Sequence, residues 1–302
     1  MKNITENMPP TRENNPEKIK PLETEVRLEI FRHSKKENDP NRPNSELLLT
    51  PEGRELAHKK GQELNPDAQV SVAGASPMDR AAETAMLITM ANEDKIDITD
   101  SLEEMDQKIA AEIKVGKKIY RDECLGFNID GPIHDEGMAA FKSGVYVEWL
   151  SKDSDRQAIA KGDQISTAYL RQAGNIAELV NRYSKIGNNF NRLAAEKKKA
   201  DQDFPDHLER YLASHQAVAE CFVAEVIKDQ EGQSAAAAFL ADLKNGWAET
   251  EGVGFRIINK GPEQIIKMSY QDKGERREIE VEIETINKII EAREEFEKKI
   301  KA

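Results

Sequence analysis

The chain has 302 residues, of which 38% are hydrophobic and 33% are charged, so it can bury a sizeable core beneath a very polar surface. Its 44 Lys and Arg residues against 56 Asp and Glu residues give a formal net charge of −12, which disfavours nucleic acid and anionic membranes as partners. The two cysteines lie outside any Cys-x-x-Cys spacing, which excludes a disulfide scaffold and a thiolate zinc site.

The amino-terminal segment, residues 1–25, is polar and punctuated by proline and asparagine, so we predict a disordered tail. It lacks the apolar core of a signal peptide, and the chain contains no apolar run long enough to span a membrane. We therefore expect a cytoplasmic protein with no membrane partner, folded as a single domain over residues 26–302.

The domain begins with alternating strands and helices. Apolar and polar residues alternate over Val26–Phe31, which predicts a half-buried strand. Thr50 followed by Pro51 predicts the start of a helix, with Thr50 as its N-cap. A second strand over 69–75 and a second helix over 78–91 complete a βαβα order, which is typical of a parallel sheet with helical crossovers.

In the rest of the chain the sequence predicts both helices and strands. Residues 95–102 are expected to form a third strand, and residues 103–163 a helical, loop-rich insertion. The later elements, taken from their periodicity, are a helix over 164–200, a strand over 210–214, a helix over 216–228, strands over 253–258, 264–270 and 277–283, and a C-terminal helix over 285–301. The fold class is therefore α/β: a three-layer α/β/α sandwich whose mostly parallel central sheet ends in antiparallel C-terminal strands.

Arg32-His33-Ser34 directly follows the first predicted strand. Ligand sites of open α/β sheets form at the carboxyl ends of the strands, so these side chains are expected at a binding edge. Arginine carries a planar, permanently charged fork that matches phosphate oxygens, and histidine can act as a nucleophile or a proton carrier.

Two later segments supply similar groups. Arg80 falls on the first turn of the second helix, where a cation opposes the helix dipole unless an anion binds there; a surface ion pair with Glu83 or Asp79 is the alternative. His215 ends the strand over 210–214 just before a helix, an environment that lowers an imidazole pKa but favours an anionic ligand. A structural histidine is the alternative there.

Together the three segments bring two histidines and two arginines to one edge of the sheet. A transferring phosphoryl group requires positioning and cations around its equatorial oxygens, so phosphoryl transfer is the chemistry that this set favours. What it lacks is an acid to protonate the leaving oxygen.

The combination resembles the histidine phosphatase superfamily, also called the phosphoglycerate-mutase-like family. Arg32-His33-Ser34 resembles its Arg-His-Gly, and Leu49-Thr50-Pro51-Glu52-Gly53 resembles its Leu-Thr-x-x-Gly. Ser76, Arg80, Ala81, Thr84 and Ala85 match its Ser-x-x-x-Arg-Ala-x-x-Thr-Ala, and Ser214-His215-Gln216 resembles its late Ser-His-Gly. The motifs occur in the family's order between Val26 and Ile227.

This resemblance implies that His33 is the nucleophile and forms a phosphohistidine, while Arg32, Arg80 and His215 complete a phosphate pocket without a metal or another cofactor. Leu102-Glu103-Glu104 resembles the family's Leu-x-Glu and nominates Glu104 as the acid, with Asp135 and Glu136 as alternatives. The expected partner is a phosphorylated small molecule or a phosphoprotein.

Two residues depart from the family pattern. Ser34 and Gln216 replace glycines; we expect the Ser34 hydroxyl to donate to a phosphate oxygen and Gln216 to narrow the pocket. Asn38 is only a loose match to the asparagine that the family has in the loop after the first strand.

From the resemblance as a whole, a phosphatase is the first hypothesis, with a mutase less favoured. A phosphate-binding module without turnover is the second, and a scaffold that pairs through the C-terminal helix is the third. Specificity is expected from the 103–163 insertion over the active site and from the 35–44 loop.

Overall fold

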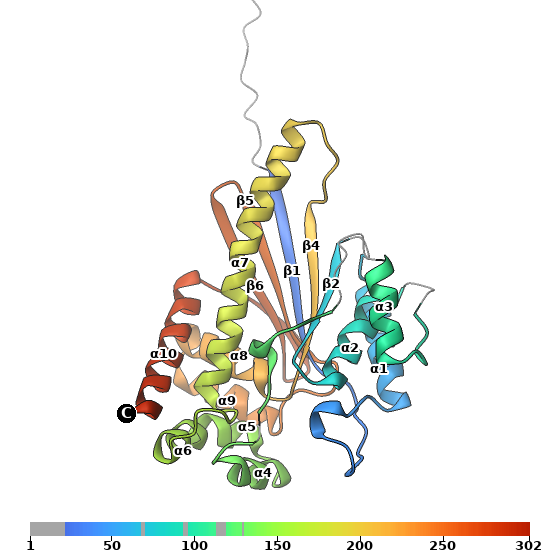
Figure 1. The fold of residues 1–302 in the computed structure, drawn as a ribbon. Helices are drawn as coiled ribbons and strands as arrows, with labels where there is room; N and C mark the ends of the chain where they lie inside the picture. The colour runs from blue at the N-terminus through green and yellow to red at the C-terminus, as the bar shows by residue number, and fades with distance from the viewer. Residues whose placement is uncertain (1–21, 68–69, 93–95, 113–118, 129) are drawn as a thin grey trace, which may run out of the picture.

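The computed structural model describes residues 22–67, 70–92, 96–112, 119–128 and 130–302. Within these ranges the centre of the molecule is a seven-stranded sheet in the order β3-β2-β4-β1-β5-β6-β7 (Figure 1). The strands are β1 (Glu23–Arg32), β2 (Ser71–Ala75), β3 (Tyr120–Arg121), β4 (His207–Ser214), β5 (Gly252–Lys260), β6 (Glu263–Asp272) and β7 (Glu275–Glu280). The pairs among β1 to β4 are parallel, whereas β5, β6 and β7 continue the sheet from β1 in antiparallel order.

Helices cover the sheet on two sides, which confirms the three-layer prediction. One layer contains α1 (Pro51–Leu64), α2 (Asp79–Thr89) and α3 (Leu102–Glu112), and the other contains α7 (Tyr169–Lys199), α8 (Val218–Glu231), α9 (Gln233–Leu243) and α10 (Ile283–Lys301) (Figure 1). Val26, Leu28 and Ile30 pack with α7 and α8, while Phe31 and Tyr211 pack with α2 on the opposite face. The alternation along β1 therefore divides the core into two clusters.

Short helices gather beyond the carboxyl ends of the parallel strands (Figure 1). They are α4 (His134–Lys142), α5 (Tyr146–Trp149) and α6 (Asp155–Lys161), together with the 3₁₀ turns η1 (Asn44–Glu46) and η2 (Glu123–Leu125) and the π turn η3 (Leu150–Ser154). The 103–163 region is thus helical and rich in loops, as predicted, over the part that the structure describes.

The third strand predicted over 95–102 is wrong for residues 96–102. Asp97 accepts the backbone N–H of Thr99, and Asp100 accepts the backbone N–H of Asp97, at 2.9 and 2.8 Å. These side chain to backbone bonds close a turn, which competes with strand pairing. The third strand along the chain is β3, within the segment predicted as an insertion.

Several boundaries also differ from the prediction. β1 begins at Glu23, so residues 23–25 belong to the sheet and not to the tail; residues 1–21 lie outside the described ranges. α7 begins at Tyr169 because the Asp163 carboxylate accepts the N–H groups of Ile165 and Ser166 and holds that segment in a separate turn. α9 was not predicted.

The C-terminal helix α10 packs against α7 and buries Ile286, Ile289, Phe296 and Ile300. Its apolar stripe is therefore occupied within this chain, which removes the main support for the scaffold hypothesis. No helix in the described ranges combines the length and apolar character needed to cross a bilayer.

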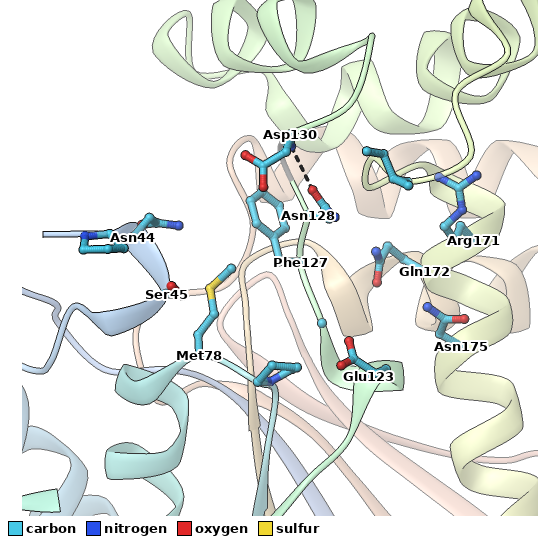
Figure 2. Close-up of a pocket in the computed structure, with 14 residues that line it drawn as sticks. Asn44, Ser45, Met78, Glu123, Phe127, Asn128, Asp130, Arg171, Gln172 and Asn175 are labelled. Atoms are coloured by element: carbon cyan, nitrogen blue, oxygen red, sulfur yellow. Dashed lines mark hydrogen bonds between the residues drawn. The ribbon is translucent and has the colours of Figure 1, made fainter.

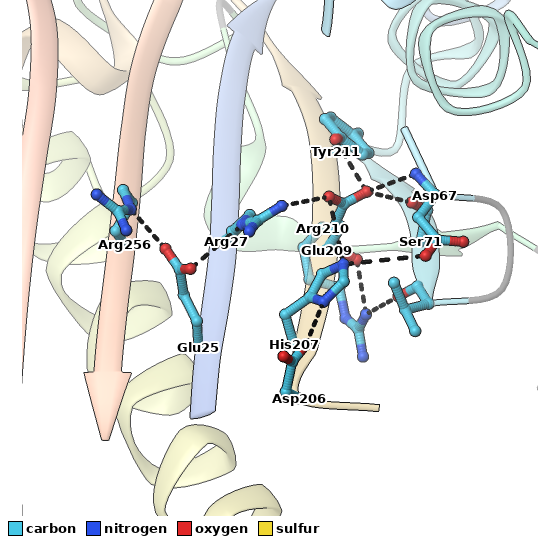
Figure 3. A network of polar contacts seen from close by, with 11 residues as sticks. Glu25, Arg27, Asp67, Ser71, Asp206, His207, Glu209, Arg210, Tyr211 and Arg256 are labelled. Atoms are coloured by element: carbon cyan, nitrogen blue, oxygen red, sulfur yellow. Dashed lines mark hydrogen bonds and ion pairs between the residues drawn. The ribbon is translucent and has the colours of Figure 1, made fainter. Parts of the chain in front are cut away.

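A polar network lies on the sheet toward the amino-terminal half of β1 (Figure 3). The buried carboxylate of Glu209 accepts from Arg27, from the hydroxyls of Ser71 and Tyr211, and from the backbone N–H of Asp67. These donors from neighbouring strands satisfy the buried negative charge of Glu209 within the sheet. We therefore interpret the network as structural.

Candidate functional site

The two histidines singled out by the sequence lie on adjacent strands. β1 pairs in parallel with β4, Arg32 is opposite Ser214, and the backbone N–H of His33 donates to the Ser214 carbonyl at 2.8 Å. This register brings the imidazoles of His33 and His215 edge to face, with ring centroids 5.1 Å apart. The parallel pairing of two chain segments therefore assembles the centre of the site.

The His33 ring is fixed in orientation and tautomer. Nδ1 lies 2.7 Å from the Ser34 carbonyl oxygen, so it carries the proton and donates it, which leaves the lone pair on Nε2. The Nε–H of Arg80 donates to that Nε2 at 3.1 Å. Burial, followed by the charge of Arg80, lowers the pKa of His33 to about 3, so the imidazole is neutral at pH 7. A neutral Nε2 is the form required of a nucleophile.

Arg80 is a buried cation, with 3% of its surface exposed. Its Nη1 donates to the Asn44 carbonyl at 2.6 Å, and its Nη2 lies 2.7 Å from Sδ of Met78. Burial lowers the pKa of Arg80 to about 10, which leaves the guanidinium charged at pH 7. The guanidinium thus presents a positive charge directly at the His33 nitrogen.

The alternative of a surface ion pair for Arg80 is wrong. Glu83 pairs with Arg54 and accepts the Leu49 N–H, and Asp79 pairs with Arg121 at 3.0 Å. The burial of a cation at a helix N-terminus is unfavourable without an anion, so the position favours an anionic ligand.

His215 and Arg32 complete the cluster. Nε2 of His215 is 2.7 Å from the Ser76 hydroxyl, and burial holds the pKa of His215 well below its usual value. Arg32 donates to the Trp247 carbonyl at 2.6 Å and reaches Glu249 at 3.4 Å. Among the described residues, His215 Nδ1 and Arg32 Nε are buried polar atoms without a hydrogen-bond partner. Such atoms are uncommon in folded proteins and are typical of ligand sites.

Ser34 is oriented away from the role expected of it. Its hydroxyl donates to the Gly53 carbonyl at 2.7 Å, and its backbone N–H donates to Thr84 Oγ1 at 3.0 Å. The hydroxyl hydrogen is therefore engaged within the protein. Gly53 in turn packs so closely that a Cβ there would lie 2.2 Å from the Lys35 carbonyl oxygen, which explains the glycine at this contact.

Gln216 likewise has an internal partner, because its side-chain amide donates to the Asn245 carbonyl. It therefore ties β4 to the loop whose Trp247 carbonyl holds Arg32. This contact gives the residue a structural function beside the site.

The carboxylates considered as the acid differ in their surroundings. Glu104 accepts from the backbone N–H and hydroxyl of Ser101 at 2.8 and 2.7 Å, while the Glu104 N–H donates back to the same hydroxyl, which forms a capping box for α3. These bonds lower the pKa of Glu104. Glu136 pairs with Lys161, whose hydrogen bond lowers the pKa of Glu136, and Asp135 is exposed in the first turn of α4.

A cavity of about 570 Å³ adjoins the cluster (Figure 2). Three of its lining residues contact the cluster: the Asn44 carbonyl and Met78 Sδ contact Arg80, and the Phe127 ring lies 5.7 Å from the His215 ring. A phosphate held by the histidines and Arg80 would therefore direct the rest of its substrate into this cavity.

Glu123 also lines the cavity, and the sequence analysis missed it. It lies two residues beyond β3, and Figure 2 shows its carboxylate directed toward the cavity. A carboxylate that follows a strand is a recognisable sequence signal. Here the strand, β3, has only two residues, which is too few to produce an alternating pattern in the sequence. Within the described residues, no group of three or more His, Cys, Asp or Glu side chains is arranged to hold a metal ion.

Residues 28–115 match the model of the histidine phosphatase superfamily (branch 1). That segment contains Arg32, His33 and Arg80, whereas His215 lies beyond it. No curated protein matches the chain.

Solved structures with similar folds include a mycobacterial glucosyl-3-phosphoglycerate phosphatase, with 13% identity, coverage of 78% of this chain and 90% of that chain, and a TM-score of 0.41. A structure described as mycobacterial hydrolase 2 has 14% identity, coverage of 88% and 97%, and a TM-score of 0.43. A phosphoglycerate mutase from Plasmodium falciparum has 12% identity, coverage of 87% and 92%, and a TM-score of 0.31.

Proposed function

We propose that the chain is a metal-independent phosphomonoesterase that acts through a phosphohistidine on His33. The match of residues 28–115 to the histidine phosphatase superfamily supports this proposal. The observation that carries this proposal is the state of His33. Its unprotonated Nε2 carries the lone pair and accepts the Arg80 Nε–H, its ring is held by the Ser34 carbonyl, and Arg80 places a positive charge beside it. This is the arrangement that nucleophilic attack on a phosphoryl group requires.

In the first step, His33 Nε2 forms a bond to phosphorus as the ester oxygen leaves, and that oxygen takes a proton from a carboxylic acid. In the second step, water attacks the phosphorus and loses a proton to the carboxylate, the Nε2–P bond breaks to return the lone pair to His33, and inorganic phosphate is released. Arg80, Arg32 and the second imidazole, His215, would stabilise the charge on the equatorial oxygens in both transition states.

We propose Glu123 as the acid in place of Glu104. Glu123 lines the cavity into which the leaving group would extend, and it follows the third strand along the chain. The Glu104 carboxylate is bonded to Ser101, and a lowered pKa disfavours the protonated form that donates. Asp135 and Glu136 remain alternatives, and neither lines this cavity.

The superfamily match is compatible with phosphatase and mutase chemistry alike. We favour hydrolysis because a mutase must retain its phosphorylated product for a second transfer, which calls for cations around a second anionic group. The cation that lines the cavity, Arg171, already pairs with Glu297 at 2.6 Å.

The test is hydrolysis of p-nitrophenyl phosphate with a chelator present, for the wild type, His33→Ala and a control, His58→Ala on α1. We expect chelator-resistant activity that His33→Ala abolishes and His58→Ala retains. A phosphoenzyme should be trapped in the wild type and be absent from His33→Ala. Equal activity of wild type and His33→Ala would exclude His33 as the nucleophile. Vanadate binding without turnover would instead support a phosphate-binding module.

A further inference from the structure

We infer that the cavity beside the phosphate cluster recognises a polyhydroxylated group without a second anionic substituent, so that the substrates are monophosphates of sugars or polyols. This inference rests on the proposed phosphatase function. The phosphate cluster, His33, His215, Arg32 and Arg80, would bind the phosphoryl group that is transferred, and the cavity would bind the leaving group.

The location of the cavity supports a role in leaving-group recognition. It meets the cluster at Asn44, Met78 and Phe127, so a phosphate at His33 has the cavity as its neighbouring space. Its volume of about 570 Å³ falls in the range of small-molecule sites. The residues come from the loop before α1, the turn before α2, the segment after β3 and the start of α7, so the walls belong to separate elements (Figure 2).

Neutral amides dominate one wall of the cavity. Gln172 is buried, with 3% of its surface exposed, and its Oε1 is a buried acceptor without a partner among the described residues. Asn175 follows one turn later, where its Oδ1 accepts from Arg293 at 2.9 Å. Figure 2 shows both side chains directed from α7 toward the cavity. An unpaired buried amide oxygen is costly unless a ligand donates to it, and a hydroxyl group is a suitable donor.

The charges in the cavity disfavour a second anion. Asp130 and Glu123 are acidic lining residues, and Figure 2 shows the Asp130 carboxylate above the cavity. Arg171 is the basic lining residue, but it is bonded to Glu297 and to the Ser166 and Asp163 carbonyls. Carboxylates accept hydrogen bonds from hydroxyls but repel phosphate and carboxylate groups, so a polyol fits this surface better than a bisphosphate. The Phe127 ring adds an apolar face for the carbon skeleton.

The experiment compares kcat/KM for three substrates: p-nitrophenyl phosphate, glucose 6-phosphate and 3-phosphoglycerate. The variants are Gln172→Met, which keeps side-chain length but removes the amide, and Asp130→Lys, which reverses a charge on the rim. Asp203→Lys makes the same charge change in the exposed loop between α7 and β4 and is the matched control. Figure 1 shows the C-terminal end of α7 far from the short helices α4, α5 and α6.

We expect the wild type to favour glucose 6-phosphate over 3-phosphoglycerate at least tenfold. Gln172→Met should lower kcat/KM for glucose 6-phosphate by about 2- to 10-fold, the value of one hydrogen bond, and lower it by a smaller factor for p-nitrophenyl phosphate, which offers no hydroxyl group. Asp203→Lys should leave both values unchanged. Asp130→Lys should raise the relative activity on 3-phosphoglycerate, and Asp203→Lys should not. Equal or better use of 3-phosphoglycerate by the wild type, or of a phosphoserine peptide, would overturn the inference.

Failure of the phosphatase proposal gives a different result. If no substrate is hydrolysed, including p-nitrophenyl phosphate, the proposed function fails, and binding of glucose 6-phosphate and inorganic phosphate is compared by calorimetry. Tighter binding of the sugar phosphate that Gln172→Met removes would support the cavity as a polyol site. Equal affinities for the two ligands would overturn it.

Discussion

Arg80 donates its Nε–H to Nε2 of His33 at 3.1 Å, so the arginine and the proposed nucleophile are in direct contact before any substrate binds. We expect a buried cation in this position to contribute little to stability and much to charge stabilisation in the transition state of the proposed reaction.

Arg80→Met is therefore expected to lower kcat/KM for p-nitrophenyl phosphate by about 10²- to 10³-fold while changing the free energy of unfolding by less than about 1 kcal/mol. Steady-state kinetics and urea denaturation measure the two effects. Arg54→Met is the control, because it leaves the buried Glu83 carboxylate unpaired and should destabilise by about 3 kcal/mol while retaining activity. A large loss of stability in Arg80→Met without loss of activity would contradict the assignment.

Stability should fall as the pH is lowered through the histidine range. The His33 pKa is about 6.5 in the unfolded chain and about 3 in the folded protein, so between these values the unfolded state binds the extra proton. The free energy of unfolding thus decreases as pH falls below 6.5, by about 2 kcal/mol at pH 5 for this group. Denaturation at pH 7.5 and 5 should show this difference between wild type and His33→Gln. Parallel curves for the two proteins would argue against a buried, neutral His33.

Glu123→Gln should affect substrates according to their leaving groups. An alkyl phosphate needs a proton on its departing oxygen, so its kcat/KM should fall by about 10²- to 10⁴-fold, whereas p-nitrophenyl phosphate, whose phenolate leaves unaided, should lose less than about tenfold. Glu104→Gln should leave both rates unchanged and lower the melting temperature slightly, because a neutral amide oxygen accepts the Ser101 hydrogen bonds less strongly than the carboxylate does. The reverse pattern would restore Glu104 as the acid.

Ser34→Gly restores the residue typical of the family and tests whether the hydroxyl binds phosphate. Since that hydroxyl bonds to the buried Gly53 carbonyl, we expect a loss of about 1–2 kcal/mol in the free energy of unfolding, with kcat/KM within about threefold of wild type. Ser34→Ala separates the hydroxyl from the backbone effect of glycine. A fall in activity in both variants at unchanged stability would make Ser34 a phosphate ligand.

Much of the fold follows from periodicity and helix signals. Buried residues alternate with more exposed ones along β1 from Glu23 to Ile30, and the Thr50 hydroxyl oxygen caps α1 by accepting the Gly53 N–H at 3.1 Å, as its sequence position predicts. The failures have a common physical cause. Ile96 and Ile98 alternate with polar residues as in a strand, but Asp97 and Asp100 close a turn, while β3 is too short to produce a pattern.

The site was predictable where it depends on strand ends. His33 and His215 follow two strands that pair in parallel, and the rule that such ends meet at one edge is enough to bring them together. Arg80 lies on the first turn of α2, the helix that follows β2, so it is expected at the same edge of the sheet. Glu123 was missed with β3, and the side-chain directions of Ser34 and Gln216 depend on tertiary partners, Gly53 and Asn245, that no local pattern specifies.

The sheet order has a consequence for synthesis. β1 is the first of the described strands to be made, yet both of its neighbours, β4 and β5, come from residues 207–260. Its apolar stripe stays unpaired while most of the polypeptide is translated, a period in which unpaired strands are prone to aggregate. Because the proposed site needs β1 paired with β4, phosphatase activity in a chain still being synthesised would indicate that these two strands have already paired.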